Sequence, residues 1–339
     1  MAKIEALFPI LNSEARLSPL ARRAAEAPLE STGSLTEYRP LMVRSMLSRI
    51  VSRRGLPFEF GLNPYRGCEF GCRYCYARYT HEFLELRKPE EFEQKIYFKE
   101  HAAWLLRQEL KRLKPGTEIA LGTATDPYQP LERRQRVTRG LLEAFAATRG
   151  LRLGIVTKST LIGRDLALLQ EVARRHALTI HLTVTTMDVP LARLLEPRAP
   201  RPDLRIRTLK KLREAGLRAG VLCSPLMPGI TDNRGSIDAV AHAAAEAGAC
   251  FFAAGALFLK PCSLPTFLAF VREHFPEQLA AYERRYGTNA FVAPAYQKRM
   301  AALVESVRQK YRLGVRFGGT ETAHRPEEAV EMQPWLPFR

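Results

Sequence analysis

The chain has 339 residues, of which 46% are hydrophobic, and its formal net charge is +17. This apolar content can fill one large core with small additions, and no apolar run reaches the roughly 18–20 residues of a membrane span. The first residues do not resemble a signal peptide, so we expect a cytoplasmic protein without membrane contact. The charge favours a polyanionic partner such as nucleic acid, although Lys and Arg are spread along the chain.

The first 55 residues are polar and basic, and we expect an extended arm with some short helix. From residue 58 onward, strand-like stretches alternate with amphipathic stretches. Strands are predicted at residues 58–62, 118–121, 153–157, 179–186, 218–223 and 250–259. Helices are predicted at residues 102–113, 138–148, 164–175, 203–215 and 236–247, with two more at 264–273 and 294–311.

This alternation indicates parallel β/α units. Six units predict an α/β fold, a partial, open (β/α)6 TIM-type barrel. We divide the chain into an N-terminal basic arm (1–55), a core (56–265) and a C-terminal helical extension and tail (266–339). In β/α barrels the active site lies at the carboxyl ends of the strands, and the polar motifs described below follow predicted strands.

Cys68, Cys72 and Cys75 form a C-x3-C-x2-C motif directly after the first predicted barrel strand. Three thiolates on one loop can each bind one iron of a cubane cluster, which leaves the fourth iron free for another ligand; such clusters usually have four Cys ligands. A structural zinc ion completed by His81 is the main alternative. Disulfides fit poorly, because the chain is long and has only six cysteines.

The cysteine motif, with Tyr74 before its last cysteine, resembles the signature of the radical S-adenosylmethionine (SAM) superfamily. The string from Asn63 to Arg78, NPYRGCEFGCRYCYAR, is similar to the spore photoproduct lyase-like, or DNA repair photolyase-like, branch of that superfamily. Further matches are TDPYQP at 125–130 with Glu132, TKS at 157–159 and EPRAP at 196–200. The resemblance covers roughly residues 45–265, and it implies the partial barrel of the radical SAM core.

The resemblance implies two cofactors, a [4Fe–4S] cluster held by Cys68, Cys72 and Cys75, and SAM. The amino and carboxylate groups of SAM would chelate the open iron. One electron from the reduced cluster would then cleave SAM reductively to methionine and a 5′-deoxyadenosyl radical, which abstracts hydrogen from the substrate. An electron donor such as flavodoxin or ferredoxin is therefore an expected partner.

The resemblance also implies contacts to SAM. Tyr74 would lie near the adenine and Lys158 near the carboxylate, with loop packing and helix capping as the respective alternatives. Thr183 lies on the polar face of the alternating stretch 179–185, which should point into the barrel. It resembles a hydroxyl residue that contacts SAM, whereas His181 on the same face is better explained as a core histidine.

Four further candidates for SAM binding follow predicted strands: Thr125, Ser159, Glu196 and Arg198. Glu196 and the arginines near it could instead form a structural ion pair. Spore photoproduct lyases proper carry a further cysteine as hydrogen-atom donor, and Thr123 stands in its place here. The O–H bond of a hydroxyl is far too strong for that role, so direct reversal of spore photoproduct is not expected.

Cys223, Cys250 and Cys262 do not form a second ligand set, and we expect them to be small buried residues. The sequence thus predicts a radical SAM enzyme that acts on DNA or RNA, in DNA repair or base modification. Two alternatives stay open. One is the same chemistry on a protein or small molecule, and the other is a non-catalytic zinc or Fe–S nucleic-acid-binding module. We assign no catalytic residue from the sequence.

Overall fold

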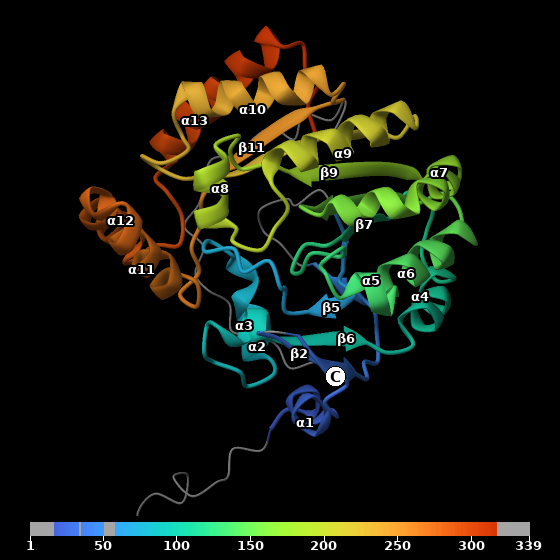
Figure 1. Cartoon of the computed structure of the whole chain (residues 1–339). Helices are drawn as coiled ribbons and strands as arrows, with labels where there is room; N and C mark the ends of the chain where they lie inside the picture. Colours follow the sequence, from blue (N-terminus) through green and yellow to red (C-terminus); the bar gives the residue numbers. More distant parts are fainter. Residues whose placement is uncertain (1–16, 34, 51–57, 317–339) are drawn as a thin grey trace, which may run out of the picture.

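The computed structural model describes residues 17–33, 35–50 and 58–316 (Figure 1). Its larger sheet has seven strands in the order β11-β10-β9-β8-β7-β4-β3. The six barrel strands run parallel to one another, and their order along the sheet follows the chain. They are β4 (Phe60–Leu62), β7 (Glu118–Leu121), β8 (Arg152–Thr157), β9 (Ala177–Thr183), β10 (Ala219–Leu226) and β11 (Phe252–Ala256).

β3 (Leu47–Arg49) pairs antiparallel with β4, so β3 and β11 form the two edges of the sheet. The molecule is thus the predicted open, partial (β/α)6 barrel of an α/β protein. All six predicted barrel strands are present, with ends that differ by a few residues from the predicted ones.

Helices cover the outer face of this sheet (Figure 1). The main ones are α4 (Ala102–Leu110), α6 (Val137–Ala146), α7 (Leu166–Arg175), α9 (Pro202–Glu214), α10 (Arg234–Glu246) and α13 (Pro294–Lys310). Their apolar faces meet the strands in one large core, in which Leu106, Leu141, Phe145 and Leu209 are fully buried. In β9, Ile180 and Leu182 belong to this core, and the alternate residues His181 and Thr183 are also buried. Both faces of the barrel strands are therefore covered, as is usual in parallel sheets.

A second, smaller sheet lies beside the barrel (Figure 1). Its order is β1-β2-β6-β5, with bounds β1 (Ser31–Thr32), β2 (Glu37–Leu41), β6 (Lys95–Lys99) and β5 (Tyr65–Arg66). Helix α1 (Pro19–Glu26) packs against this sheet through Ala24 and Leu41. The prediction of an extended arm with short helix was therefore incomplete, because the described part of residues 1–55 adds strands to both sheets. The domain boundaries themselves stay a prediction.

The remaining short elements are η3 (Tyr76–Arg78), α2 (Tyr79–Glu82), α3 (Glu91–Gln94), α5 (Glu132–Gln135), η4 (Thr160–Asp165), α8 (Val189–Leu195) and η5 (Pro276–Gln278). Helices α11 (Leu264–His274) and α13 match the two predicted C-terminal helices, whereas α12 (Leu279–Tyr286) was not predicted. Within the described ranges no helix is long and apolar enough to cross a membrane. Residues 317–339, the end of the predicted C-terminal tail, lie outside the described residues.

Candidate cluster and SAM site

The cysteine loop connects β5 to η3 and makes two turns that require glycine. Gly67 and Gly71 have φ angles of +82° and +63°. A Cβ atom on Gly67 would lie 2.7 Å from the carbonyl oxygen of Phe92, and one on Gly71 would lie 2.9 Å from a guanidinium nitrogen of Arg198. At Gly67 the backbone conformation and the backbone neighbour exclude a side chain, and at Gly71 the left-handed backbone conformation favours glycine. The two glycines therefore shape the path of the loop around Cys68 and Cys72.

The three cysteines of this loop are free thiols, with Cys68 and Cys72 buried and Cys75 partly buried. Burial raises the pKa of Cys72 to about 12. Burial, and after it the neighbouring Asp126, Cys72 and Cys75, raise the pKa of Cys68 well above its ordinary value. The three sulfurs therefore lie close enough to interact electrostatically. Without a cation these thiols hold their protons, and a bound metal would displace them.

The donor set suits a cubane better than a single zinc ion. Across residues 17–33, 35–50 and 58–316, no three His, Cys, Asp or Glu side chains converge to hold one metal ion. Zinc requires four ligands at tetrahedral distances from one point, whereas the cysteines of a cubane bind different irons and stand further apart. His81, the candidate fourth zinc ligand, has its Nε2 atom 2.9 Å from the carbonyl oxygen of Lys95. The zinc alternative thus gains no support.

A network of buried polar groups faces the cysteine loop. The Tyr74 hydroxyl donates to Oε1 of Glu196, and it lies 3.1 Å from Oγ1 of Thr185. Thr185 also donates to Glu196, at 2.8 Å. Arg205 forms an ion pair with Glu196 at 2.5 Å, and both side chains are 1% exposed. Lys158 Nζ lies 5.7 Å from the centre of the Tyr74 ring. Five residues, one from the loop and four from the β8 and β9 units of the barrel, therefore form one cluster.

Charge balance keeps this network ionised. Burial acts to raise the pKa of Glu196, but the Arg205 and Lys158 cations outweigh it and hold that pKa below its ordinary value. Burial likewise acts to lower the pKa of Lys158, and the neighbouring Cys72 and Glu196 raise it instead. Lys158 therefore keeps a partly buried positive charge beside the cysteine loop, where it is available to an anionic ligand.

Asp126 aligns the ends of two neighbouring strands at this site. Its carboxylate accepts hydrogen bonds from the Thr157 hydroxyl at 2.6 Å and from the backbone N–H groups of Lys158 at 2.7 Å and Tyr128 at 2.9 Å. The loop after β7 is thereby joined to the end of β8. This contact fixes the backbone from which Lys158 projects.

The structure gives the other predicted residues distinct surroundings. Thr125 donates to the carbonyl of Gly67 at 2.6 Å and so fastens the cysteine loop. The Ser159 hydroxyl accepts from the N–H of Leu161 at 3.2 Å and caps η4. The carbonyl of Thr183 accepts from Arg205 at 3.0 Å, and Arg198 lies against Gly71. The contacts of all four residues to SAM stay predictions.

Sequence reasoning missed two parts of the site. Thr185 continues the polar face of the 179–185 alternation, which is the signal that could have identified it. Ser263 donates to the carbonyl of Cys75 at 2.7 Å, and no local pattern marks it. His181, with its ring centre 5.0 Å from that of Phe251, is a buried core residue as expected.

The three remaining cysteines differ in their surroundings. Cys223 is buried, and its thiol lies 3.8 Å from the carbonyl oxygen of Thr185. Cys250 and Cys262 are only partly buried. The prediction of small buried residues was therefore right for Cys223 and too strong for the other two.

Residues 62–238, just over half of the chain, match the Radical SAM superfamily, and the chain belongs to this superfamily. It is a radical SAM enzyme, and its cofactors are a [4Fe–4S] cluster and SAM. "Uncharacterized protein Rv2578c" of Mycobacterium tuberculosis is 33% identical to it over 277 residues, which is 81% of each chain. "Uncharacterized protein MJ0683" of Methanocaldococcus jannaschii is 29% identical over 174 residues, or 51% of this chain and 62% of that protein.

Solved structures of spore photoproduct lyase share the fold. One, a mutant with bound AdoMet and dinucleoside spore photoproduct, has a TM-score of 0.57 and 15% sequence identity, and the match covers 80% of this chain and 78% of that one. A second mutant structure has a TM-score of 0.58 and 17% identity, over 80% and 79% of the two chains. At such identities the likeness is one of fold.

Proposed function

We propose that Cys68, Cys72 and Cys75 hold the [4Fe–4S] cluster, and that the side chains facing the loop bind SAM. The observation that carries this proposal is the convergence of the glycine-shaped cysteine loop with Lys158 and the Glu196–Arg205 ion pair. The cluster, when bound, supplies the electron that cleaves the sulfonium–carbon bond of SAM. A one-electron reductant of the flavodoxin or ferredoxin class would supply that electron to the cluster.

The protein groups have separate roles in this proposal. The Lys158 cation, partly buried and beside Cys72, attracts the SAM carboxylate. The Glu196–Arg205 pair holds the Tyr74 hydroxyl, so the ring of Tyr74 has a fixed orientation for contact with the adenine. Thr183, Ser159, Thr125 and Arg198 are the further SAM contacts of this proposal, and burial of the network would exclude water from the bound SAM.

We propose a nucleic acid as the substrate, in DNA repair or base modification. The net charge of +17 favours a polyanion, and the spore photoproduct lyase of similar fold binds a dinucleoside photoproduct. The reaction differs from direct reversal of spore photoproduct, because Thr123 offers a hydroxyl where a thiol is needed. Tyr76 donates to the Thr123 carbonyl, which holds this residue in place.

Cleavage of SAM tests the first part of the proposal. The protein would be reconstituted anaerobically with iron and sulfide, reduced with dithionite and supplied with SAM, and 5′-deoxyadenosine would be measured. We expect the wild-type protein to be brown and to produce 5′-deoxyadenosine. The Cys72→Ala variant should be pale and should produce none. Cys250→Ala is the matched control, because Cys250 precedes β11 at the opposite end of the strands. A pale wild-type protein that leaves SAM intact would contradict the proposal.

Binding to nucleic acid tests the second part. Fluorescence anisotropy with short DNA and RNA oligonucleotides would be measured between low and physiological salt. We expect affinity that falls steeply as salt rises, because each phosphate contact releases counterions. An enzyme that cleaves SAM but shows no salt-dependent binding would favour a protein or small-molecule substrate instead.

A further inference from the structure

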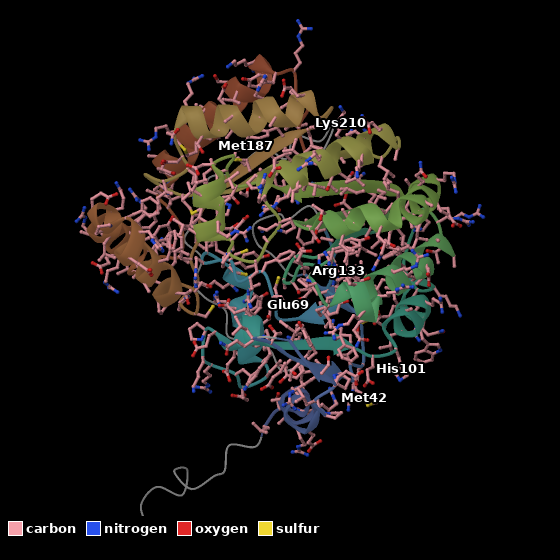
Figure 2. All side chains as sticks on the ribbon, viewed as in Figure 1. Met42, Glu69, His101, Arg133, Met187 and Lys210 are labelled. Carbon is pink, nitrogen blue, oxygen red and sulfur yellow. The ribbon has the colours of Figure 1, made fainter. Side chains whose placement is uncertain are left out.

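A buried carboxylate lies inside the cysteine motif itself. Glu69 directly follows Cys68, and its side chain is buried instead of facing solvent. Figure 2 shows Glu69 between the barrel and the small sheet, near the centre of the molecule. Glutamate is rarely buried without partners, so the contacts of Glu69 indicate what its position requires.

Two hydrogen-bond donors from distant parts of the chain hold this carboxylate. The backbone N–H of Leu131 donates to Oε1 at 2.8 Å, and the Tyr38 hydroxyl donates to Oε2 at 2.7 Å. Tyr38 lies on β2 of the small sheet, 31 residues before Glu69, and Leu131 follows it by 62. Since both partners donate, the arrangement suits an ionised carboxylate.

The peptide groups on both sides of Cys68 are fastened as well. Gln129 Oε1 accepts from the N–H of Glu69 at 3.0 Å, and its Nε2 donates to the carbonyl of Gly67 at 3.3 Å. The N–H of Cys68 donates to the carbonyl of Phe92 at 3.0 Å. The first cysteine of the motif is therefore fixed through its own backbone and through both neighbouring residues.

The small sheet includes the strand that leads into the cysteine loop. β5, which ends one residue before Gly67, pairs with β6, and β2 pairs with the other edge of β6. Tyr38 stands opposite Ile96 in this pairing. The strand that carries Tyr38 is thus joined to the cysteine loop twice, through the sheet and through Glu69.

We propose that Glu69 and Tyr38 are positioning residues for the cluster. Together they fix Cys68 and link the N-terminal strand β2 to the metal site. This inference rests on the proposed role of Cys68, Cys72 and Cys75 as cluster ligands. It assigns a function to the small sheet, which serves as a support for the first ligand. It also places a buried negative charge next to that ligand, where charge affects the reduction potential of a cluster.

The test compares cluster release and reduction potential in two variants. Tyr38→Phe removes one donor and leaves a buried carboxylate oxygen without it, and Glu69→Gln removes the charge at nearly constant volume. We expect both variants to lose iron to an external chelator about tenfold faster than the wild type, because groups that orient metal ligands affect metal affinity by about 10–100-fold. We also expect Glu69→Gln to shift the midpoint potential, followed by EPR, to a less negative value.

The matched control is Tyr311→Phe. The Tyr311 hydroxyl also donates to a carboxylate, Asp238 Oδ2, at 2.8 Å, but the pair joins α13 to α10 away from the cysteine loop. We expect this variant to lose less thermal stability, because Asp238 is 26% exposed, and to show unchanged iron release and potential. In the double variant of Tyr38 and Glu69, the effects on iron release should be less than additive, since both changes break the same contact.

Two outcomes would overturn the inference. One is iron release and midpoint potential at wild-type values in both variants, with only the melting temperature lowered as in Tyr311→Phe. The other is full additivity in the double variant. The measurements need neither SAM nor substrate, so a protein that holds its cluster but fails to cleave SAM would contradict the proposed function while leaving this test intact.

Discussion

The two sides of the candidate site are held together by different forces. The cysteine side relies on glycine conformations and on hydrogen bonds to backbone groups, as between Thr125 and Gly67 or Cys68 and Phe92. The opposite side relies on buried charges, with Glu196 between Arg205 and Lys158. A ligand loop must present three sulfurs in a fixed geometry, whereas a site for a charged cofactor must supply preset charges. The comparison shows that backbone conformation and hydrogen bonds dominate on the cysteine side, where Glu69 is the buried charge, whereas a buried ion pair dominates on the opposite side.

The largest expected effect comes from breaking the charged side. Arg205→Ala would leave Glu196 as a buried carboxylate without its partner, and we expect a loss of about 3–5 kcal/mol in the free energy of unfolding. Arg207→Ala is the control, because Arg207 pairs with Asp203 while 67% exposed, and such pairs contribute at most about 1 kcal/mol. Anaerobic urea denaturation of the apoprotein measures both. Equal losses of unfolding free energy in the two variants would show that the buried pair stabilises the fold no more than the exposed pair does.

On the cysteine side, Gly67→Ala should act through shape alone. Gly67 and Gly116 share a φ of +82°, but a Cβ on Gly67 would lie 2.7 Å from the Phe92 carbonyl, whereas nothing lies within 4 Å of one on Gly116. Both alanine variants should lose about 1–2 kcal/mol in the free energy of unfolding because of the left-handed backbone conformation, and the clash at Gly67 should add about 1–3 kcal/mol to that loss. We also expect reduced iron incorporation only for Gly67→Ala. Similar iron content in both variants would refute the argument from shape.

Tyr74→Phe addresses the point at which the two sides meet. Loss of the hydroxyl removes a hydrogen bond to the charged Glu196, so we expect the free energy of unfolding to fall by about 1.5–3 kcal/mol. We also expect SAM to bind more weakly to the cluster-loaded protein. Tyr286→Phe is the control, since the Tyr286 hydroxyl donates to a neutral acceptor, the Leu257 carbonyl, at 3.0 Å. Calorimetric titration with SAM distinguishes them, and equal SAM affinity in both variants would exclude Tyr74 from that site.

The smallest expected effect is a dependence of stability on pH. The pKa of Glu196 in the folded protein is lowered from its ordinary value of 4.5, against the effect of burial, by Arg205 and Lys158. Its ionised form therefore stabilises the fold above that ordinary value, and the contribution is lost as the pH falls through the lowered pKa. Denaturation of the apoprotein at several acidic pH values should show a steeper loss in wild type than in Glu196→Gln. Parallel curves would mean that the charge contributes nothing.

The barrel was predictable because its signals are local. Each strand and helix carries its own periodicity, and residues such as Ile180 and Leu182 alternate with polar neighbours within a few positions. The cysteine motif was equally visible, since its spacing lies within eight residues. The small sheet was not, because β5 has two residues and β2 pairs with β6 across more than fifty positions. A short stretch of sequence therefore does not predict the pairing of β2 with β6.

The same distinction applies within the site. Tyr74, Lys158 and Glu196 belong to blocks that the sequence displays, and the structure brings them together. The links among them are long-range contacts, such as Thr185 to Tyr74, which are 111 positions apart. Glu69 was visible as part of the motif, yet its partners Tyr38 and Leu131 could be found only once the chain was folded.

The bond from Ser263 to the Cys75 carbonyl has a consequence for how the enzyme is made. The two residues are 188 positions apart, and they join the first barrel unit to the segment after the last strand. During synthesis the cysteine loop leaves the ribosome early, but this contact cannot form until more than three quarters of the polypeptide has been translated. The full set of hydrogen bonds around the loop is therefore completed only after the sixth barrel strand has been made.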